Sequence, residues 1–215
     1  RHAKSGQWWE NEGQRALANN SVSYKFKPDM DTFMREWLAL YESKSGERGI
    51  FNRQAAKKQA SLNGRRDAEQ EFGCNPCSEI ILRPYQFCNL SEVVVRSSDT
   101  QQSLTNKVRL ATILGTFQST LTNFKYLRNV WKKNTTEERL LGVSLTGIMD
   151  NAMMSGKSTH LGMNISATLN ALKEEAINTN AVMAEKLGIS QSAAITCVKP
   201  SGTVSQLVNS ASGIH

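Results

Sequence analysis

The sequence predicts a mixed α/β fold, and two kinds of segment support this. Residues 104–124 and 166–187 carry apolar side chains at the spacing of a helix that buries one face. Residues 92–95 are rich in β-branched side chains and residues 193–198 are mostly apolar, which predicts two strands. With 39% hydrophobic and 21% charged residues among 215, the chain has the composition of a domain that buries a core.

The first part of the chain contains two predicted helices. Residues 1–28 are irregular apart from a short alternating run at 22–26. Residues 31–42 form a predicted helix in which Phe33, Trp37, Leu38 and Tyr41 share one face. Residues 53–62 form a short basic helix that ends at Asn63-Gly64. Residues 63–91 contain glycine and proline among the cysteines and are expected to be loop with short extended pieces.

The later elements alternate between helix and strand. Thr136 is expected to open a short helix, and residues 142–147 fit either a strand or the start of the next helix. Residues 155–164 are polar and predict a surface loop. The last long helix has Ser166 as its expected N-cap and Gly188 as its C-terminal stop.

Charge and hydropathy limit the possible classes of partner. The chain carries 26 Lys and Arg against 19 Asp and Glu, a net charge of +7, which suits phosphate-bearing molecules. Basic residues do not form a block of five or alternate with aromatics, so no nucleic acid is expected as a partner. No apolar run approaches the ~20 residues that span a membrane. The first residues lack the apolar centre of a signal peptide, so we expect a cytoplasmic protein.

Three of the four cysteines, Cys74, Cys77 and Cys88, lie close together, and the fourth is Cys197. Clustered cysteines in a reducing compartment usually bind metal or perform redox chemistry. A structural zinc site needs a second pair of ligands at similar spacing, and none is present, so no metal is expected. A thioredoxin-like pair needs a helix directly after the C-x-x-C, and the sequence predicts none there.

Asn75, Cys77 and Glu79 follow one another at every second position. If this loop is extended, their amide, thiol and carboxylate point to the same side. Such a set can bind a diol, accept a proton and supply a nucleophile or a hydrogen atom. By geometry alone, a turn with incidental polar groups is the simpler interpretation.

The stretch from Asn75 to Ile80, followed by Cys88-Asn89-Leu90, resembles the finger loop of ribonucleotide reductases in its class II, adenosylcobalamin-dependent form. Four other segments resemble the same family in the same order along the chain. They are residues 16–21, 49–53, 137–147 and 199–205.

The resemblance implies a role for each finger-loop residue. Cys77 would be the thiyl-radical cysteine that takes hydrogen from the ribose 3′ carbon, and Glu79 the base on the 3′ hydroxyl. Asn75 would hydrogen-bond the ribose hydroxyls. Cys88 would be one of two thiols that reduce the 2′ position. Cys74 has no assigned role and is expected to pack.

Residues 199–205 read Lys-Pro-Ser-Gly-Thr-Val-Ser, between a predicted strand and a short helix. Small residues there allow backbone N–H groups to face a phosphate, although the residues alone favour a plain turn. The resemblance implies that this loop holds the substrate's phosphates. The substrate-binding residues would then be Ser201, Gly202, Thr203 and Ser205, with Asn20 and Ser21 also near the substrate.

The resemblance also implies the wider context. The chain would be a single partial domain over 1–215, part of a ten-stranded α/β barrel that encloses the finger loop at about 73–90 and carries the phosphate loop at about 199–205. Expected partners are the ribonucleotide substrate, an external thiol reductant such as thioredoxin, and the remaining barrel segments. Adenosylcobalamin would be bound mainly by the complete enzyme. The other redox cysteine is expected upstream, so the chain alone is expected to be inactive.

Two alternatives remain at this stage. A class I ribonucleotide reductase large subunit has the same finger-loop Asn, Cys and Glu, but the form of residues 75–79 and 199–205 favours class II. The other alternative is a non-catalytic nucleotide- or metal-binding module that retained the motifs.

Overall fold

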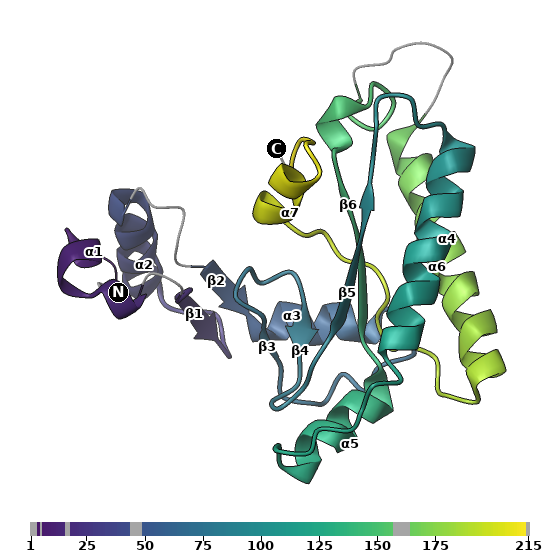
Figure 1. Cartoon of the computed structure of the whole chain (residues 1–215). Coiled ribbons are helices and arrows are strands. Elements are labelled where there is room, and N and C mark those ends of the chain that lie inside the picture. Colours follow the sequence, from purple (N-terminus) through teal and green to yellow (C-terminus); the bar gives the residue numbers. More distant parts are fainter. Residues whose placement is uncertain (1–3, 5, 16–17, 44–48, 157–163, 214–215) are drawn as a thin grey trace. The chain divides into compact units, whose positions relative to one another are not determined.

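The structure is a computed structural model that describes residues 4, 6–15, 18–43, 49–156 and 164–213 (Figure 1). The chain divides into two compact units, Arg1–Pro84 and Tyr85–His215.

The first unit contains a parallel pair of strands connected by a helix. Strand β1 (Ser21–Tyr24) pairs with β2 (Gly49–Asn52), and α2 (Met30–Ser43) lies between them in sequence. Helix α3 (Arg53–Ser61) begins at Asn52, whose side chain accepts hydrogen bonds from the backbone N–H groups of Gln54 and Ala55. Both helices predicted in this region are therefore confirmed. Two short helices, α1 (Trp8–Asn11) and η1 (Gly13–Arg15), precede β1.

A hairpin of two very short strands completes the first unit. Strand β3 (Gly73–Cys74) pairs antiparallel with β4 (Ile81–Leu82), so the residues between them form a closed loop. The small core of this unit consists of Phe51, Ala56, Ala60 and Phe72, and Cys74 packs against it. The expected packing role of Cys74 is confirmed.

The second unit is built on parallel strands. Strand β5 (Asn89–Val94) pairs in parallel with β6 (Leu141–Thr146) in a register that places Glu92 opposite Ser144. On the other side of β6, the backbone N–H groups of Leu141 and Val143 donate to the carbonyls of Ala194 and Ile195. Residues 193–198, predicted as a strand, therefore run beside β6, although only Thr196 forms a ladder bridge.

Several helices accompany these strands. Helices α4 (Gln101–Gln118) and α6 (Ile165–Leu187) lie side by side on one face of the strands, and α7 (Gly202–Leu207) lies on the other (Figure 1). Helix α5 (Asn129–Glu138) and η2 (Ile148–Asp150) flank β6. Helix α4 begins with a capping box between Thr100 and Ser103, and α6 ends at Gly188 in the left-handed conformation.

Several boundaries differ from the sequence predictions. The helix predicted over 104–124 begins three residues earlier and ends at Gln118, because residues 119–124 turn away. Thr136 lies near the end of α5 instead of opening a helix. The ambiguous residues 142–147 are mainly strand. Asn164, and not Ser166, caps α6, since its side chain accepts from the Ser166 backbone N–H. Most of the predicted loop over 155–164 lies outside the described residues.

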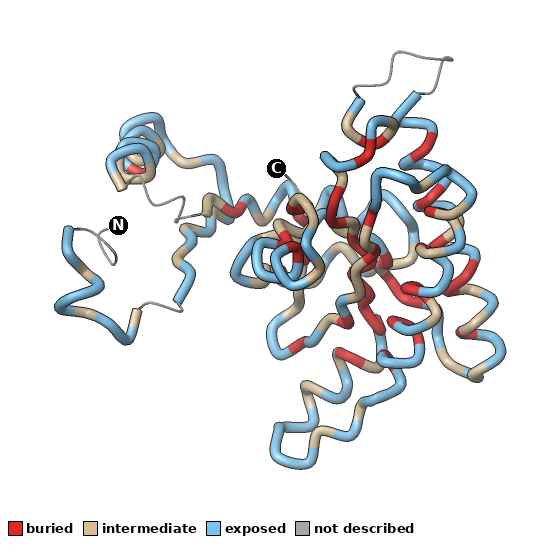
Figure 2. Tube along the Cα trace, turned by 45° about the horizontal axis from the view of Figure 1, so that its top comes forward, coloured by how far each residue is buried: buried red, intermediate tan, exposed pale blue. Residues whose placement is uncertain are grey.

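The core of the second unit lies between the strands and the two long helices (Figure 2). Alternate strand residues, Val93, Val95 and Val143, point to this core and contact buried residues of α4 and α6. The intervening residues, such as Glu92 and Ser144, therefore belong to the opposite face of the strands. No described helix is both long and apolar enough to cross a membrane.

Candidate functional site

The finger-loop residues form a tight turn between β3 and β4. The Ser78 backbone N–H donates to the Asn75 carbonyl at 3.0 Å, and the Asn75 N–H donates to the Ile80 carbonyl at 3.3 Å. The Asn75 side chain closes the turn, because its Oδ1 accepts from the Ile80 backbone N–H at 3.0 Å. Cys77 is exposed at the tip of this turn as a free thiol.

The assumption that this loop is extended is therefore wrong. Ser78 has a φ of 64°, in the left-handed region, so residues 75–79 do not alternate as a strand does. Asn75 and Glu79 are partly buried on either side of the exposed Pro76-Cys77 tip. The turn, closed by two hydrogen bonds between residues 75 and 80, presents the thiol.

Asn20 and Ser21 lie where β1 meets β2. The Asn20 carbonyl accepts a hydrogen bond from the Gly49 N–H at 3.0 Å, and Ser21 is opposite Gly49 in the strand register. A β-carbon at Gly49 would lie 2.7 Å from Ser21 Oγ and 3.3 Å from Ser78 Oγ. The predicted substrate residue Ser21 and the finger-loop residue Ser78 therefore approach the same glycine.

Cys88 directly precedes β5 and is partly buried. It belongs to the second unit, whereas Cys77 belongs to the first. None of the four cysteines, all of which lie within the described residues, forms a disulfide. That Cys77 and Cys88 take part in the same reaction stays a prediction.

The predicted phosphate loop joins residues 193–198, which run beside β6, to α7. Ser201 is 4% exposed and has a φ of 58°, and Gly202 and Thr203 form the exposed first turn of the helix. The Ser201 side chain makes no capping hydrogen bond to this helix. Ser205 is buried, and its hydroxyl donates to the Gly202 carbonyl at 2.9 Å, so its side chain stabilises the loop internally.

Two residues that were not predicted from the sequence hold this loop on the strands. The Ser201 hydroxyl donates to a carboxylate oxygen of Glu92 on β5. The Lys199 backbone N–H donates to Ser144 Oγ on β6 at 3.1 Å. Burial raises the pKa of Glu92, and the positive charge of Lys199 opposes this increase without cancelling it. The sequence signal for them is a polar residue within each of two largely apolar strands.

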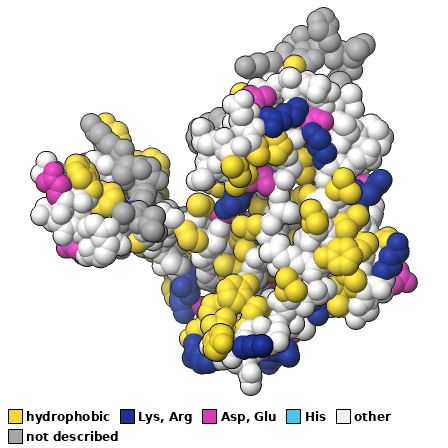
Figure 3. Space-filling view, viewed as in Figure 1, with side chains coloured by type: hydrophobic (Ala, Val, Ile, Leu, Met, Phe, Trp, Pro, Cys, Tyr) yellow, Lys and Arg dark blue, Asp and Glu magenta, His cyan; other side chains and the backbone are white. Residues whose placement is uncertain are grey.

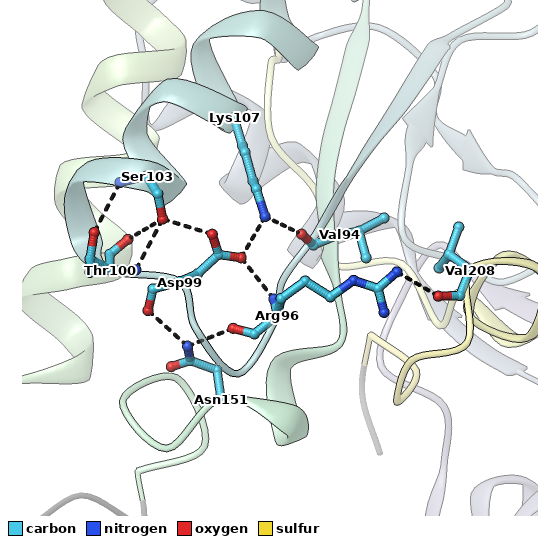
Figure 4. Close-up of polar contacts among 8 residues, drawn as sticks. All are labelled: Val94, Arg96, Asp99, Thr100, Ser103, Lys107, Asn151 and Val208. Atoms are coloured by element: carbon cyan, nitrogen blue, oxygen red, sulfur yellow. Dashed lines mark hydrogen bonds and ion pairs between the residues drawn. The ribbon is translucent and has the colours of Figure 1, made fainter.

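The far end of α7 is held by a network at the carboxyl end of β5 (Figure 4). The Arg96 guanidinium donates to the carbonyls of Val208 and Asn209, at 2.6 and 2.9 Å. Asp99 fixes this segment by accepting from the Arg96 backbone N–H, the Ser103 hydroxyl and the Lys107 ammonium, at 2.7, 2.7 and 2.5 Å. The Asn151 amide donates to the carbonyls of Arg96 and Asp99.

Among the described residues, no group of three or more His, Cys, Asp or Glu side chains is arranged to hold a metal ion. All three histidines, His2, His160 and His215, lie outside the described residues.

The comparison with solved structures identifies the class of fold. The chain matches the crystal structure of a B12-dependent, class II ribonucleotide reductase with a TM-score of 0.64. The match covers 97% of this chain and 32% of that protein, at 23% sequence identity. The mixed α/β arrangement is therefore shared with part of a class II ribonucleotide reductase.

The sequence relatives are more specific. The chain is 28% identical to the adenosylcobalamin-dependent ribonucleoside-triphosphate reductase of Lacticaseibacillus paracasei, over 94% of the chain and 29% of the relative. The protein of the same name from Levilactobacillus brevis gives the same identity and coverage. The one from Lactobacillus acidophilus is 30% identical over 66% of the chain and 22% of its own length. No protein-family model matches the chain.

These findings confirm the resemblance to class II ribonucleotide reductases over nearly the whole chain. The chain spans about three tenths of the length of the curated relatives it matches.

Proposed function

We propose that this chain is a catalytic segment of an adenosylcobalamin-dependent ribonucleoside-triphosphate reductase, which converts ribonucleoside triphosphates or diphosphates to deoxyribonucleotides. The observation that carries the proposal is the free thiol of Cys77 at an exposed turn closed by Asn75, in a chain that is similar to such reductases over 94% of its length.

Cys77 would act as a thiyl radical that takes the hydrogen atom from C3′ of the ribose. Its exposure and freedom fit this role, because the thiol has to meet both a radical source and the substrate. Adenosylcobalamin, when bound by the complete enzyme, supplies the radical chemistry that removes the hydrogen atom from this thiol. After reduction at C2′, Cys77 would return a hydrogen atom to C3′.

The neighbouring polar residues would handle the ribose hydroxyls. Glu79 would accept the proton of the 3′ hydroxyl and later return it, while the 2′ hydroxyl takes a proton from the thiol pair that includes Cys88 and leaves as water. Asn75 Oδ1 already accepts from the Ile80 N–H, so the amide nitrogen of Asn75 would be its donor to the ribose. The turn thereby orients this donor beside the radical cysteine.

Cys88 and a second thiol of the complete enzyme would supply the two electrons and two protons and become a disulfide. An external thiol reductant such as thioredoxin would then reduce this disulfide. The substrate's phosphates would bind at residues 199–205, where the uncapped first turn of α7 offers backbone N–H groups. The ten-stranded barrel around the finger loop, and a cytoplasmic location, are part of this proposal.

The central test is Cys77→Ser in the full-length enzyme. A serine O–H bond is too strong to exchange hydrogen with the cofactor radical or the ribose, so we expect no deoxynucleotide. Binding of radiolabelled CTP should remain close to that of the unaltered enzyme. Appreciable turnover by the variant would refute the assignment. Zinc analysis of the same preparation tests the alternative of a metal-binding module, which predicts stoichiometric zinc.

A further inference from the structure

Glu92 and Ser144 form a pair on the strand face that carries α7. They are opposite each other in the parallel register of β5 and β6. Their neighbours Val93 and Val143 point to the helical core, so both polar side chains belong to the other face. Glu92 accepts from the Ser201 hydroxyl, and Ser144 accepts from the Lys199 N–H. The pair therefore fixes two positions of the phosphate loop, two residues apart.

The bond to Glu92 changes what Ser201 does for its own helix. A serine at a helix N-cap normally has extended backbone angles, and its oxygen accepts from an N–H of the first turn. Ser201 instead has φ 58° and ψ 30°, and its side chain makes no capping bond. A left-handed conformation is unfavourable for a non-glycine residue, so surrounding contacts must maintain it. The hydrogen bond to Glu92 is such a contact.

We propose that Glu92 is a positioning residue for substrate phosphate binding. Glu92 keeps the Ser201 hydroxyl away from the first turn of α7, and it holds the loop at 199–205 in its binding geometry. This inference rests on the function proposed for residues 199–205. The backbone N–H groups of Gly202, Thr203 and Val204 precede the first intrahelical bond, in which the Ser205 N–H donates to the Ser201 carbonyl. With Ser201 held by Glu92, these N–H groups remain available to an external acceptor.

The test measures binding of radiolabelled CTP to the full-length enzyme with cobalamin omitted, so that affinity is read without turnover. Glu92→Leu removes the acceptor, frees Ser201 to cap α7, and should raise the dissociation constant about tenfold, the effect of one hydrogen bond to a charged group. Glu92→Gln keeps an acceptor oxygen and should recover most of the affinity. With cobalamin restored, the Glu92→Leu enzyme should show the loss mainly in KM, with kcat within about threefold.

A double-variant cycle tests whether Glu92 acts through Ser201. Ser201→Gly removes the hydroxyl while suiting the left-handed backbone, and should also weaken CTP binding about tenfold. Glu92→Leu combined with Ser201→Gly should be no weaker than either single variant, because both remove the same bond. Glu174→Leu, at an exposed glutamate of α6, is the matched control and should leave the dissociation constant unchanged.

Three results would overturn the inference: unchanged CTP affinity in Glu92→Leu, a double variant about a hundredfold weaker, or Glu92→Gln as weak as Glu92→Leu. A failure of the proposed function gives a different result. An unaltered enzyme that binds CTP and forms no deoxynucleotide refutes the reductase activity, while the binding series still decides the role of Glu92.

Discussion

Gly213 packs directly against the backbone carbonyl of Lys199. A β-carbon built at Gly213 would lie 2.1 Å from the Lys199 carbonyl oxygen and 2.9 Å from the Leu145 carbonyl oxygen. The Gly213 N–H also donates to the Pro200 carbonyl at 3.1 Å. The segment after α7 therefore returns to the start of the loop at 199–205, and the stretch from residue 199 to residue 213 is closed at its base.

Gly202, in contrast, is open to added volume. A β-carbon there would have no atom within 4 Å, and its backbone angles are available to any residue. Gly202→Val should therefore leave the melting temperature of the full-length enzyme nearly unchanged. If the first turn of α7 binds phosphates, the valine side chain should obstruct their approach and raise the KM for CTP about tenfold or more. An unchanged KM would indicate a plain turn.

Gly213→Ala is the counterpart of this variant. The added methyl group must displace two backbone carbonyls, and overpacking of this kind costs typically 1–3 kcal/mol. We expect a lower melting temperature together with weaker CTP binding. Equal stability of the Gly202 and Gly213 variants would contradict the close packing of Gly213 against the Lys199 and Leu145 carbonyls.

Cys88→Ser should separate reduction from hydrogen abstraction. The proposed radical cysteine, Cys77, is intact in this variant, so hydrogen abstraction from the ribose should still occur. Without the Cys88 thiol the 2′ position cannot be reduced cleanly, and we expect release of free base and loss of cofactor in place of deoxynucleotide. The assay is chromatography of the nucleotide products. Many turnovers with an external dithiol would remove Cys88 from the redox pair.

The Asp99 network predicts a pH dependence of stability. Burial raises the pKa of Asp99, but hydrogen bonds from Lys107, Ser103 and the Arg96 backbone outweigh burial and lower the pKa below its ordinary value of 3.8. The ionised carboxylate therefore stabilises the fold above that pH, and this contribution is lost as the pH falls through the lowered folded-state pKa.

Asp99→Asn tests this relationship. The side chain is 7% exposed, so at pH 7 the variant should be less stable by about 1.5–3 kcal/mol, the range for hydrogen bonds to a charged group. The difference in free energy of unfolding between the two proteins should shrink below pH 3.8. Denaturant unfolding at several pH values measures it. Asp31→Asn, at an exposed α2 residue, is the control and should show little difference at any pH.

The helices and strands could be predicted because their signals are local. The apolar spacing in α4 and α6 and the β-branched run in β5 depend on residues that are near neighbours in sequence. The boundaries near Gln118 and Thr136 could not be predicted as well, since local sequence signals define helix ends less sharply than helix interiors.

Sequence motifs single out Cys77 and the loop at 199–205 as candidate site residues, whereas contacts between residues distant in sequence leave no such motif. Cys77 and the loop at 199–205 were identified by resemblance, but the turn that presents Cys77 depends on the bond from Ile80 to Asn75 and on a left-handed Ser78. Glu92 is 109 positions from Ser201, so only the folded chain reveals their contact. The sequence signal for this contact is a glutamate among the apolar residues of a strand.

The exposed side chains of α4 predict how the isolated chain behaves. Leu110, Leu114 and Phe117 are 61%, 67% and 48% exposed and recur at three- and four-residue spacing, and hydrophobic side chains gather over this helix in Figure 3. Among the described residues, no strand pairs with the free edge of β5 beside them. An apolar stripe next to an open strand edge favours association, so the 215-residue chain should elute from size exclusion above its monomer mass of 23.9 kDa.

Replacing Leu110 and Leu114 by Gln should shift the elution of the chain toward the monomer, whereas Gln substitution of the exposed Leu207 of α7 should not. A monomeric unaltered chain would contradict this prediction.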